Sequence, residues 1–287
     1  MNYLIAATKA EAAPLVSALK LTKTAGAFDC FWNEDTALVI SGIGKCRSAA
    51  ACAWLQSRPL NTHTPQHASK NSLNRGRHTD CWINFGIAGH KDAAIGSVHE
   101  AHKITDHGSN HVWYPPRISS QLPSANLTTF DKPISAYLGD QLHDMEASGF
   151  IDTARMFAHA ELVQAVKIVS DNEQSPLSDV DAKKATELIA DNISAILGLL
   201  ERLKNQSSEI YQIENTIYDE ITTQWRFSVS QKVQLERQLE RYNTLHDPLM
   251  EIPTDLLKVK SSKDVIGWLT LASDLSLIHI SEPTRPY

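Results

Sequence analysis

The sequence lacks the usual signatures of a membrane or secreted protein. Its 287 residues contain no apolar run that approaches the length of a membrane span. The N-terminal stretch MNYLIAATKAEA enters a short apolar run with no basic leader and no small-residue cleavage site. From these absences we expect no membrane partner and no signal peptide. We therefore expect a cytoplasmic location.

Cysteine is scarce, and its spacing suggests neither a disulfide framework nor a metal site. The four cysteines show no CxxC pair and lie in or beside apolar segments. They are Cys30, Cys46, Cys52 and Cys81. We expect buried free thiols in a reducing compartment.

The chain also lacks an excess of positive charge. It has 27 Lys and Arg against 33 Asp and Glu, a net charge of -6 and a pI near 6.0. Nucleic-acid binders usually carry a basic face, so that class of protein is not expected. A composition of 42% hydrophobic and 21% charged residues is ordinary for a globular protein of one large domain with room for an appendage.

Residues 275–287 are expected not to belong to the natural gene. The stretch LSLIHISEPTR, at Leu275–Arg285, is identical to the translation of a transposon-end sequencing adapter. The alternative is a genuine, weakly amphipathic terminus. We leave these residues out of the prediction of fold and function, and expect the natural chain to continue past Asp274.

Short apolar runs alternate with helical patterns along most of the chain. Buried strands are predicted at residues 2–8, 36–41, 81–89, 96–106 and 162–172. Apolar residues at helical spacing predict helices at 9–21, 45–56 and 182–203. This alternation predicts an α/β fold, with three α/β/α layers around a mostly parallel central sheet and ligands at the carboxyl ends of its strands.

Two stretches depart from this pattern. Residues 57–80 are polar and interrupted by proline, which predicts a long loop inserted between a helix and a strand. From about residue 205 the pattern becomes wholly helical, with Ser228 and Gln231 spaced as a capping box. We therefore divide the chain into a main domain at 1–204 and a C-terminal helical appendage at 205–274. For the appendage we expect a packing or oligomer surface.

Five short motifs occur in the order found in one known family. They are AATKAEAAPL near the N-terminus, SGIGK at 41–45, NFGIAG at 84–89, DMEASG at 144–149 and VKIVSDN at 166–172. Together they resemble the purine nucleoside phosphorylase and methylthioadenosine/adenosylhomocysteine nucleosidase family, the phosphorylase superfamily. The resemblance covers roughly residues 1–204. It implies an enzyme of nucleoside metabolism that binds a small-molecule purine nucleoside, uses no cofactor and forms a homo-oligomer.

The chemistry of this family requires an acid near the base. Cleaving a purine N-glycosidic bond passes through a ribosyl cation-like transition state, and the purine leaves more easily when it is protonated. The resemblance implies that Asp171 is the catalytic acid, with Ser170 beside it in the substrate site. On position alone, Asp171 could instead cap the helix that follows the strand.

The stretch LHDMEASGF places two carboxylates around a methionine. The resemblance implies that Glu146 binds both ribose hydroxyls and that Met145 packs against the sugar, while Asp144 has a less defined place in the substrate site. Without the family, alternation along a strand would put Asp144 and Glu146 on one face with Met145 opposite. That alternative is an exposed acidic edge.

Glu11 corresponds to the glutamate that helps activate the attacking water in nucleosidases. The alternative is a solvated residue in the first turn of a helix. Gly44, Lys45 and Arg47 follow a glycine turn at a helix N-terminus and offer an anion site, which phosphorolysis would need. A carboxylate at Glu11 would repel a phosphate dianion, so hydrolysis is favoured and phosphate remains an alternative co-substrate.

The chain departs from the family pattern in two places. Ile87, Ala88 and Gly89 occupy the substrate-binding stretch where nucleosidases often have a serine, so a hydroxyl contact is replaced by isoleucine. The segment between strand 96–106 and Asp144 is also shorter than in the family. It contains NLTTF as a short strand, and Trp113 or Tyr114 as an aromatic residue that could stack on a purine.

The sequence HEAH, at His99–His102, has the residue types of a zinc site. Its two histidines are three residues apart in a predicted strand, whereas HExxH requires a helix and a spacing of four. We predict no metal.

The sequence therefore predicts hydrolysis of a 5′-modified adenosine, with phosphorolysis as the alternative. A catalytically weak nucleoside-binding or scaffold protein is a further alternative.

Overall fold

The structure is a computed structural model that describes residues 1–58, 79–119, 121–134, 136–137, 139–246, 249 and 251–281. The predicted loop at 57–80 lies almost entirely outside the described residues. The strands are β1 (Asn2–Ala6), β2 (Thr22–Thr24), β3 (Asp29–Trp32), β4 (Thr36–Ile40), β5 (Cys81–His90), β6 (Val98–Asp106), β7 (Val112–Trp113), β8 (Ser124–Thr129), β9 (Leu142–Asp144) and β10 (Val163–Asp171). The α-helices are α1 (Lys9–Ala18), α2 (Lys45–Ser57), α3 (Ala147–Ala154), α4 (Ala182–Asp191), α5 (Ile193–Gln224), α6 (Val229–Leu245) and α7 (Ser262–Ser281).

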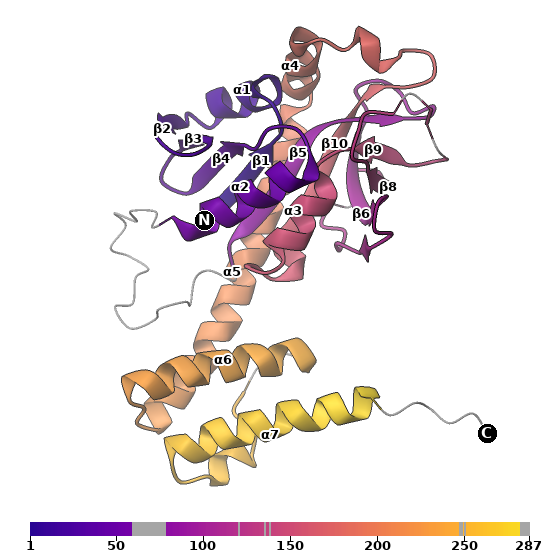
Figure 1. Ribbon diagram of the computed structural model, residues 1–287. Coiled ribbons are helices and arrows are strands. Elements are labelled where there is room, and N and C mark those ends of the chain that lie inside the picture. The colour runs from indigo at the N-terminus through magenta and orange to yellow at the C-terminus, as the bar shows by residue number, and fades with distance from the viewer. Residues whose placement is uncertain are drawn as a thin grey trace, which may run out of the picture. The chain divides into compact units, whose positions relative to one another are not determined.

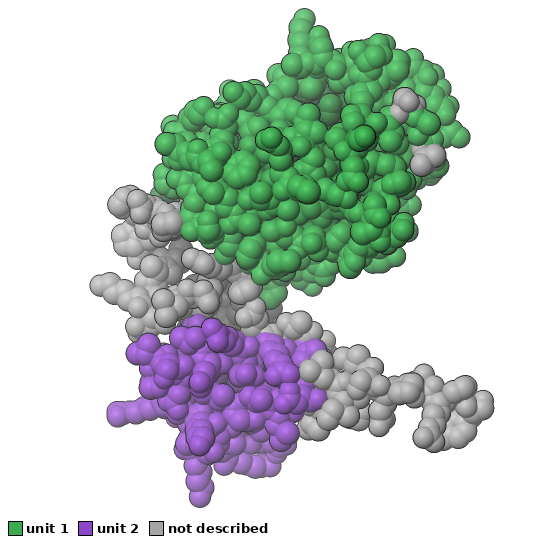
Figure 2. Space-filling model, in the orientation of Figure 1, with its two compact units in different colours: residues 1–62, 77–207 green, residues 63–76, 208–287 purple. Residues whose placement is uncertain are grey.

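The chain divides into two compact units, which Figure 2 draws in different colours. Unit 1 comprises Met1–Thr62 and Arg77–Ser207, and unit 2 comprises His63–Gly76 and Ser208–Tyr287. The division near residue 207 falls inside α5. All the strands named above lie in unit 1.

The sheet of unit 1 runs in the order β10-β6-β8-β9-β5-β1-β4-β3-β2, and β10 also pairs with β5. That additional pairing closes β10, β6, β8, β9 and β5 into a barrel, while β1 to β4 extend the sheet from β5 (Figure 1). Pairings of β5 with β1 and β10 are parallel, whereas those of β5 with β9 and β6 with β10 are antiparallel. The predicted α/β class is confirmed. The sheet is mixed and partly closed, so it differs from the mostly parallel sheet that was predicted.

The central strands form where the sequence has continuous apolar runs. All residues of β1 and β10 are buried, as expected for strands that are covered on both faces. The predicted strands at 2–8, 36–41, 81–89, 96–106 and 162–172 are present as β1, β4, β5, β6 and β10, and NLTTF lies in β8. The short strands β2, β3 and β7 were not predicted, because two to four residues are too few to show a strand pattern.

The helices α1 and α2 follow their strands as predicted, whereas the helix expected at 182–203 is two helices, α4 and α5. In unit 2, Ser228 and Gln231 form the predicted capping box of α6. The unit has its own apolar core, made by Ile217, Tyr218, Ile221, Trp225, Leu235, Leu239, Leu249, Leu256, Val265 and Leu269. Among the described residues, no helix combines the length and the apolar character that crossing a membrane requires.

Candidate active site

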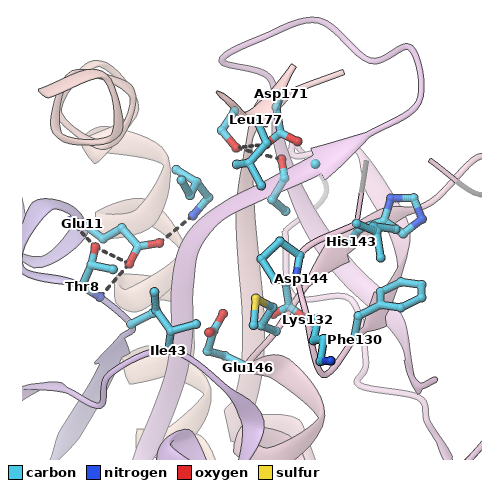
Figure 3. A pocket seen from close by; sticks show the side chains of 18 of the residues that line it. Thr8, Glu11, Ile43, Phe130, Lys132, His143, Asp144, Glu146, Asp171 and Leu177 are labelled. Atoms are coloured by element: carbon cyan, nitrogen blue, oxygen red, sulfur yellow. Dashed lines mark hydrogen bonds between the residues drawn. The ribbon is translucent and has the colours of Figure 1, made fainter. Parts of the chain in front are cut away.

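A cavity of about 210 Å³ lies at the carboxyl ends of β1, β5, β8, β9 and β10. The predicted residues Glu11, Asp144, Met145, Glu146 and Asp171 all line it, together with Ile87, Ala88, Gly89 and Ser170. Figure 3 shows Glu11, Glu146 and Asp171 around this cavity, each carried by a different element. The tertiary structure therefore brings together residues that are up to 160 positions apart in sequence, from Glu11 to Asp171.

Asp171 ends β10 at an irregularity of the strand. The pairing of β10 with β5 shifts between Val169 and Asp171, so that Asp171 lies opposite Gly89. Neighbouring side chains of a regular strand point to opposite faces, but a bulge can turn both to the same side. Ser170 and Asp171 accordingly both line the cavity, and the Ser170 hydroxyl donates a hydrogen bond of 2.5 Å to Asp171 Oδ1.

Asp171 does not cap a helix, which was the alternative explanation from its position. The next α-helix, α4, begins at Ala182, and its N-cap is Asp181, whose side chain accepts a hydrogen bond from the Lys184 amide. Asp171 is only 3% exposed, and its second oxygen, Oδ2, accepts a hydrogen bond from the Tyr137 hydroxyl. The carboxyl group is thus buried at the wall of the cavity.

Glu146 lies at the start of α3, directly after β9. Its Oε1 accepts a hydrogen bond of 2.8 Å from the Gly44 amide, which belongs to the glycine turn before α2. Burial, followed by the negative charge of Asp144, raises the pKa of Glu146 from 4.5 to about 7, against the opposing effects of Lys167 and the Gly44 amide. Glu146 therefore has a pKa near neutrality, and it lines the cavity with a second oxygen beside the one that the Gly44 amide binds. Such a carboxyl group is suited to binding hydroxyl groups.

The Glu146 pKa predicts how stability changes with pH. Because the folded-state pKa is raised, this group contributes stability that is fully present below pH 4.5 and is lost as pH rises through about 7. We expect the free energy of unfolding of Glu146→Gln to fall less than that of the wild type between about pH 5 and about pH 8, as measured by urea denaturation. Glu187→Gln, at a half-exposed glutamate, is the matched control. An identical pH dependence in wild type and Glu146→Gln would contradict the raised pKa.

The carboxylate of Asp144 is bound by neighbouring groups of the protein and is not free to bind a ligand. Its Oδ1 accepts from the Thr129 hydroxyl at 2.7 Å, and its Oδ2 accepts from the Ala147 amide at 2.9 Å. Lys167, which is 1% exposed, places its Nζ 2.9 Å from Asp144 Oδ2. Burial opposes the charge of Lys167, but the negative charges of Asp144 and Glu146 outweigh it and raise the lysine pKa. The pair supports the start of α3, where Glu146 lies.

The alternative of an exposed acidic edge at Asp144 and Glu146 is not what the structure shows. β9 ends at Asp144, and the backbone then enters α3, so strand alternation does not continue to Glu146. Asp144 and Glu146 are each 7% exposed, and Met145 lines the cavity with both of them.

Glu11 is a buried residue of the cavity wall and not a solvated one. It is 4% exposed and forms a capping box with Thr8, whose amide and hydroxyl both donate to Glu11 Oε2 at 2.8 Å. Its other oxygen, Oε1, accepts a hydrogen bond of 3.0 Å from the Ile87 amide. Oε1 has a second lone pair beside the one bound by the Ile87 amide, so Glu11 can still accept a hydrogen bond from a bound water.

Two glycines of β5 make room for two of these carboxylates. A Cβ atom on Gly86 would lie 2.5 Å from Glu11 Oε1, and one on Gly89 would lie 2.7 Å from Asp171 Oδ2. Both distances are shorter than nonbonded carbon–oxygen contacts allow. The glycines of the NFGIAG motif are therefore required by the close approach of Glu11 and Asp171.

The predicted anion site is not directed at the cavity. The Gly44 amide is bound to Glu146, and Lys45 Nζ forms ion pairs with Asp106 at 2.8 Å and Asp131 at 2.9 Å. Hydrogen bonds to Asp106 and Asp131 raise the pKa of Lys45. Arg47 is exposed, and none of the three residues is among those lining the cavity.

Several residues that line the cavity were not predicted from the sequence. Phe130, His143 and Tyr137 add aromatic rings, with ring centroids 5.5 Å apart for Phe130 and His143 and 5.9 Å for Tyr137 and His143. Phe130 directly follows the β8 strand, and its position at the carboxyl end of a strand could have predicted that it lines the cavity. The rest of the lining that was not predicted is Ala7, Thr8, Ile43, Lys132, Pro133, Ile134 and Leu177.

Trp113 and Tyr114, which were proposed as aromatic residues for a purine, lie elsewhere. Trp113 packs against the core, and Tyr114 is 67% exposed. Three of the cysteines are buried free thiols as expected, but Cys46 is exposed.

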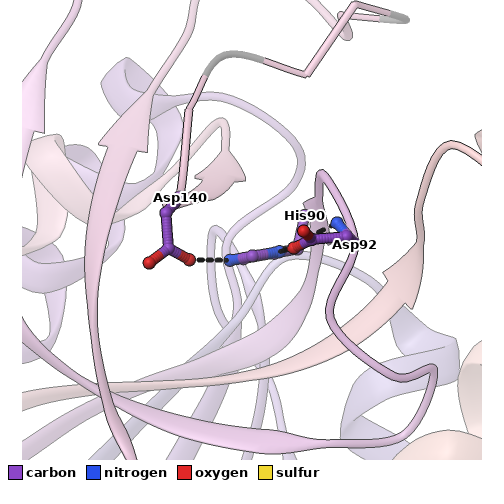
Figure 4. A group of neighbouring side chains, drawn as sticks. All are labelled: His90, Asp92 and Asp140. Carbon is purple, nitrogen blue, oxygen red and sulfur yellow. Dashed lines mark hydrogen bonds and ion pairs between the residues drawn. The ribbon is translucent and has the colours of Figure 1, made fainter.

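One cluster outside the cavity has the residue types of a cation site. His90 lies between Asp92 and Asp140, at 3.5 Å and 3.3 Å from their carboxylates (Figure 4). The Nδ1 atom of His90 accepts hydrogen bonds from the Asp92 and Ala93 amides, and its Nε2 lies 3.3 Å from Asp140 Oδ1. His99 and His102 lie in β6, a strand as predicted.

Comparisons with known proteins support the fold. No protein-family model matches the chain, and no curated protein matches it in sequence. Among solved structures, the 5′-methylthioadenosine/S-adenosylhomocysteine nucleosidase of Helicobacter pylori, in complex with butyl-thio-DADMe-Immucillin-A, is similar with a TM-score of 0.53 and 12% identity over 70% of this chain and 97% of that one. The nucleosidases of Neisseria meningitidis, with methylthio-immucillin-A, and Streptococcus pneumoniae, with 8-aminoadenine, both give a TM-score of 0.52, with 17% and 18% identity. They cover 71% and 70% of this chain and 98% and 99% of their own.

The predicted resemblance to the nucleosidase family is confirmed at the level of fold. At these identities the similarity shows the arrangement of helices and strands and does not extend to the roles of individual residues.

Proposed function

We propose that this protein is an N-ribosyl hydrolase, an enzyme that cleaves the bond between a purine and ribose with water. Its particular substrate would be a 5′-modified adenosine such as 5′-methylthioadenosine. One observation carries the proposal: Glu11, Glu146 and Asp171, three buried carboxyl groups from three elements, line the same cavity.

The reaction assigns one role to each group. Asp171 gives its proton to N7 of the purine as the bond between C1′ and N9 breaks, and the electron pair of that bond stays on the purine. Glu146 accepts hydrogen bonds from the two ribose hydroxyls, while Met145 contacts the sugar. Glu11 accepts a proton from the water whose oxygen attacks C1′. The products are adenine and the 5-modified ribose.

Hydrolysis is favoured over phosphorolysis by the charges around the cavity. A phosphate dianion beside C1′ would face the carboxylate of Glu11 at close range, which is repulsive. Lys45 already pairs with Asp106 and Asp131. Lys132 also lines the cavity, but Figure 3 places it near Phe130 and away from Glu11.

The substrate class is supported by the structures of similar fold. Those nucleosidases were solved with methylthio-immucillin-A, butyl-thio-DADMe-Immucillin-A or 8-aminoadenine, which are nucleoside or purine analogues. For the present protein we propose the same class of ligand, a reaction without a cofactor or metal, a cytoplasmic location and a homo-oligomer. The last two rest on the free thiols and on the family resemblance.

The proposal is tested by measuring adenine release from 5′-methylthioadenosine, adenosylhomocysteine, 5′-deoxyadenosine and adenosine, with and without phosphate. We expect release without phosphate and a free 5-modified ribose as the second product. Release that requires phosphate and yields a ribose 1-phosphate would instead show a phosphorylase. No release from a folded protein would favour a nucleoside-binding protein.

A further inference from the structure

Tyr137 contacts Asp171 from a segment that has no role in the reaction described above. It lies in the connection between β8 and β9, and its hydroxyl donates a hydrogen bond of 2.5 Å to Asp171 Oδ2. The other oxygen, Oδ1, accepts a hydrogen bond of 2.5 Å from the Ser170 hydroxyl. Each oxygen of the carboxyl group is therefore bound by a different hydroxyl.

Two hydrogen bonds restrict the orientation of the Asp171 carboxyl group more than one hydrogen bond can. The last torsion of an aspartate side chain is broad, so a single hydrogen bond leaves the plane of the carboxyl group free to rotate. A second hydroxyl on the opposite oxygen restricts that rotation. Ser170 is the neighbour of Asp171 in β10, whereas Tyr137 holds the group from another element.

The surroundings of the Tyr137 ring keep its hydroxyl in place. The ring lies against the backbone of Gly89, where a Cβ atom would be 2.7 Å from Tyr137 Cε1, and its centroid is 5.9 Å from that of His143. Burial, followed by the hydrogen bond to Asp171, raises the pKa of the Tyr137 hydroxyl. The hydroxyl therefore keeps its proton and remains a donor.

We infer that Tyr137 is a positioning residue for the proton transfer, an inference that rests on the proposed function. Its hydroxyl, together with that of Ser170, orients the Asp171 carboxyl group toward the purine in the cavity. Tyr137 then affects the reaction through Asp171 alone, and only where the leaving group must be protonated.

Two substrates separate this role from a structural one. The purine of 5′-methylthioadenosine needs a proton to leave, whereas the nitrophenolate of 4-nitrophenyl 5-methylthio-β-D-riboside leaves as a stable anion. We would measure kcat and KM on both for wild type and for Tyr137→Phe, which removes only the hydroxyl. Tyr114→Phe, at an exposed tyrosine outside the cavity, is the matched control, and Asp171→Asn is the reference for loss of the acid.

We expect Tyr137→Phe to lower kcat on methylthioadenosine about tenfold, because it removes one hydrogen bond to the carboxylate that Asp171 becomes as it gives up its proton, and to leave KM within about twofold. On the nitrophenyl riboside its kcat should equal that of the wild type, and Tyr114→Phe should match the wild type on both substrates. Asp171→Asn should show the pattern of Tyr137→Phe with a larger fall.

An equal fall of kcat on both substrates would mean that Tyr137 is merely structural, and no fall on either would mean that it has no role. Both results overturn the inference while the proposed function stands. A wild-type protein that is inactive on both substrates would refute the proposed function itself, and the inference with it.

Discussion

Asp171→Asn is expected to lower kcat for 5′-methylthioadenosine by about 10²- to 10⁴-fold, the usual contribution of general acid catalysis. Asparagine keeps the size of the side chain, and its single amide oxygen can accept one of the two hydrogen bonds that Ser170 and Tyr137 donate to Asp171. It has no acidic proton to give to the purine, so the leaving group must depart as an anion. The measurement is the steady-state rate of adenine release.

The control for this prediction is Asp152→Asn, the same substitution at an exposed aspartate of α3 that does not line the cavity. Its kcat should match that of the wild type, and both variants should unfold at the urea concentration that unfolds the wild type. If Asp171→Asn kept a rate within about threefold of the wild type, Asp171 would not be the acid.

Lys167→Met is expected to lower the free energy of unfolding by about 3–5 kcal/mol, because it leaves the buried carboxylate of Asp144 without its ion-pair partner. The Lys167 and Asp144 side chains are 2% and 0% exposed, so water cannot replace the lost charge. Such a loss is a large share of the roughly 5–15 kcal/mol that stabilises a typical domain. Urea denaturation followed by circular dichroism gives the value.

Two variants make this result specific. Lys183→Met removes a lysine that is 83% exposed and pairs loosely with Glu187, so its effect should stay below about 1 kcal/mol. The double variant Lys167→Met with Asp144→Asn removes both charges and should be more stable than Lys167→Met alone. Equal stability of the single and double variants would show that the unpaired Asp144 charge is not the cause.

The sequence was most informative where local pattern and function coincide. The runs that form β1 and β10 are continuously apolar, which is sufficient to predict buried strands, and Asp171 stands where the last of these runs ends. Glu11 and Glu146 were found through motifs and not through periodicity. Their burial could not be foreseen from local spacing, and a solvated Glu11 was an open alternative.

Tertiary structure decided the shape of the sheet and the surroundings of each acid. The barrel closes because β10 pairs with β5 as well as β6, and no local signal specifies which distant strands pair. The Gly44 amide meets Glu146 across 102 residues, and the Tyr137 hydroxyl meets Asp171 across 34.

By itself, the sequence of this protein determined its α/β class and its buried strands, which follow from residue types and short spacings. Glu11, Glu146 and Asp171, three of the carboxyl groups that line the cavity, were identified through motifs that resemble a known family. The mixed sheet, the Lys167–Asp144 pair and the two hydroxyls on Asp171 were decided only by the tertiary structure, because each depends on contacts between segments whose separation in the sequence carries no pattern.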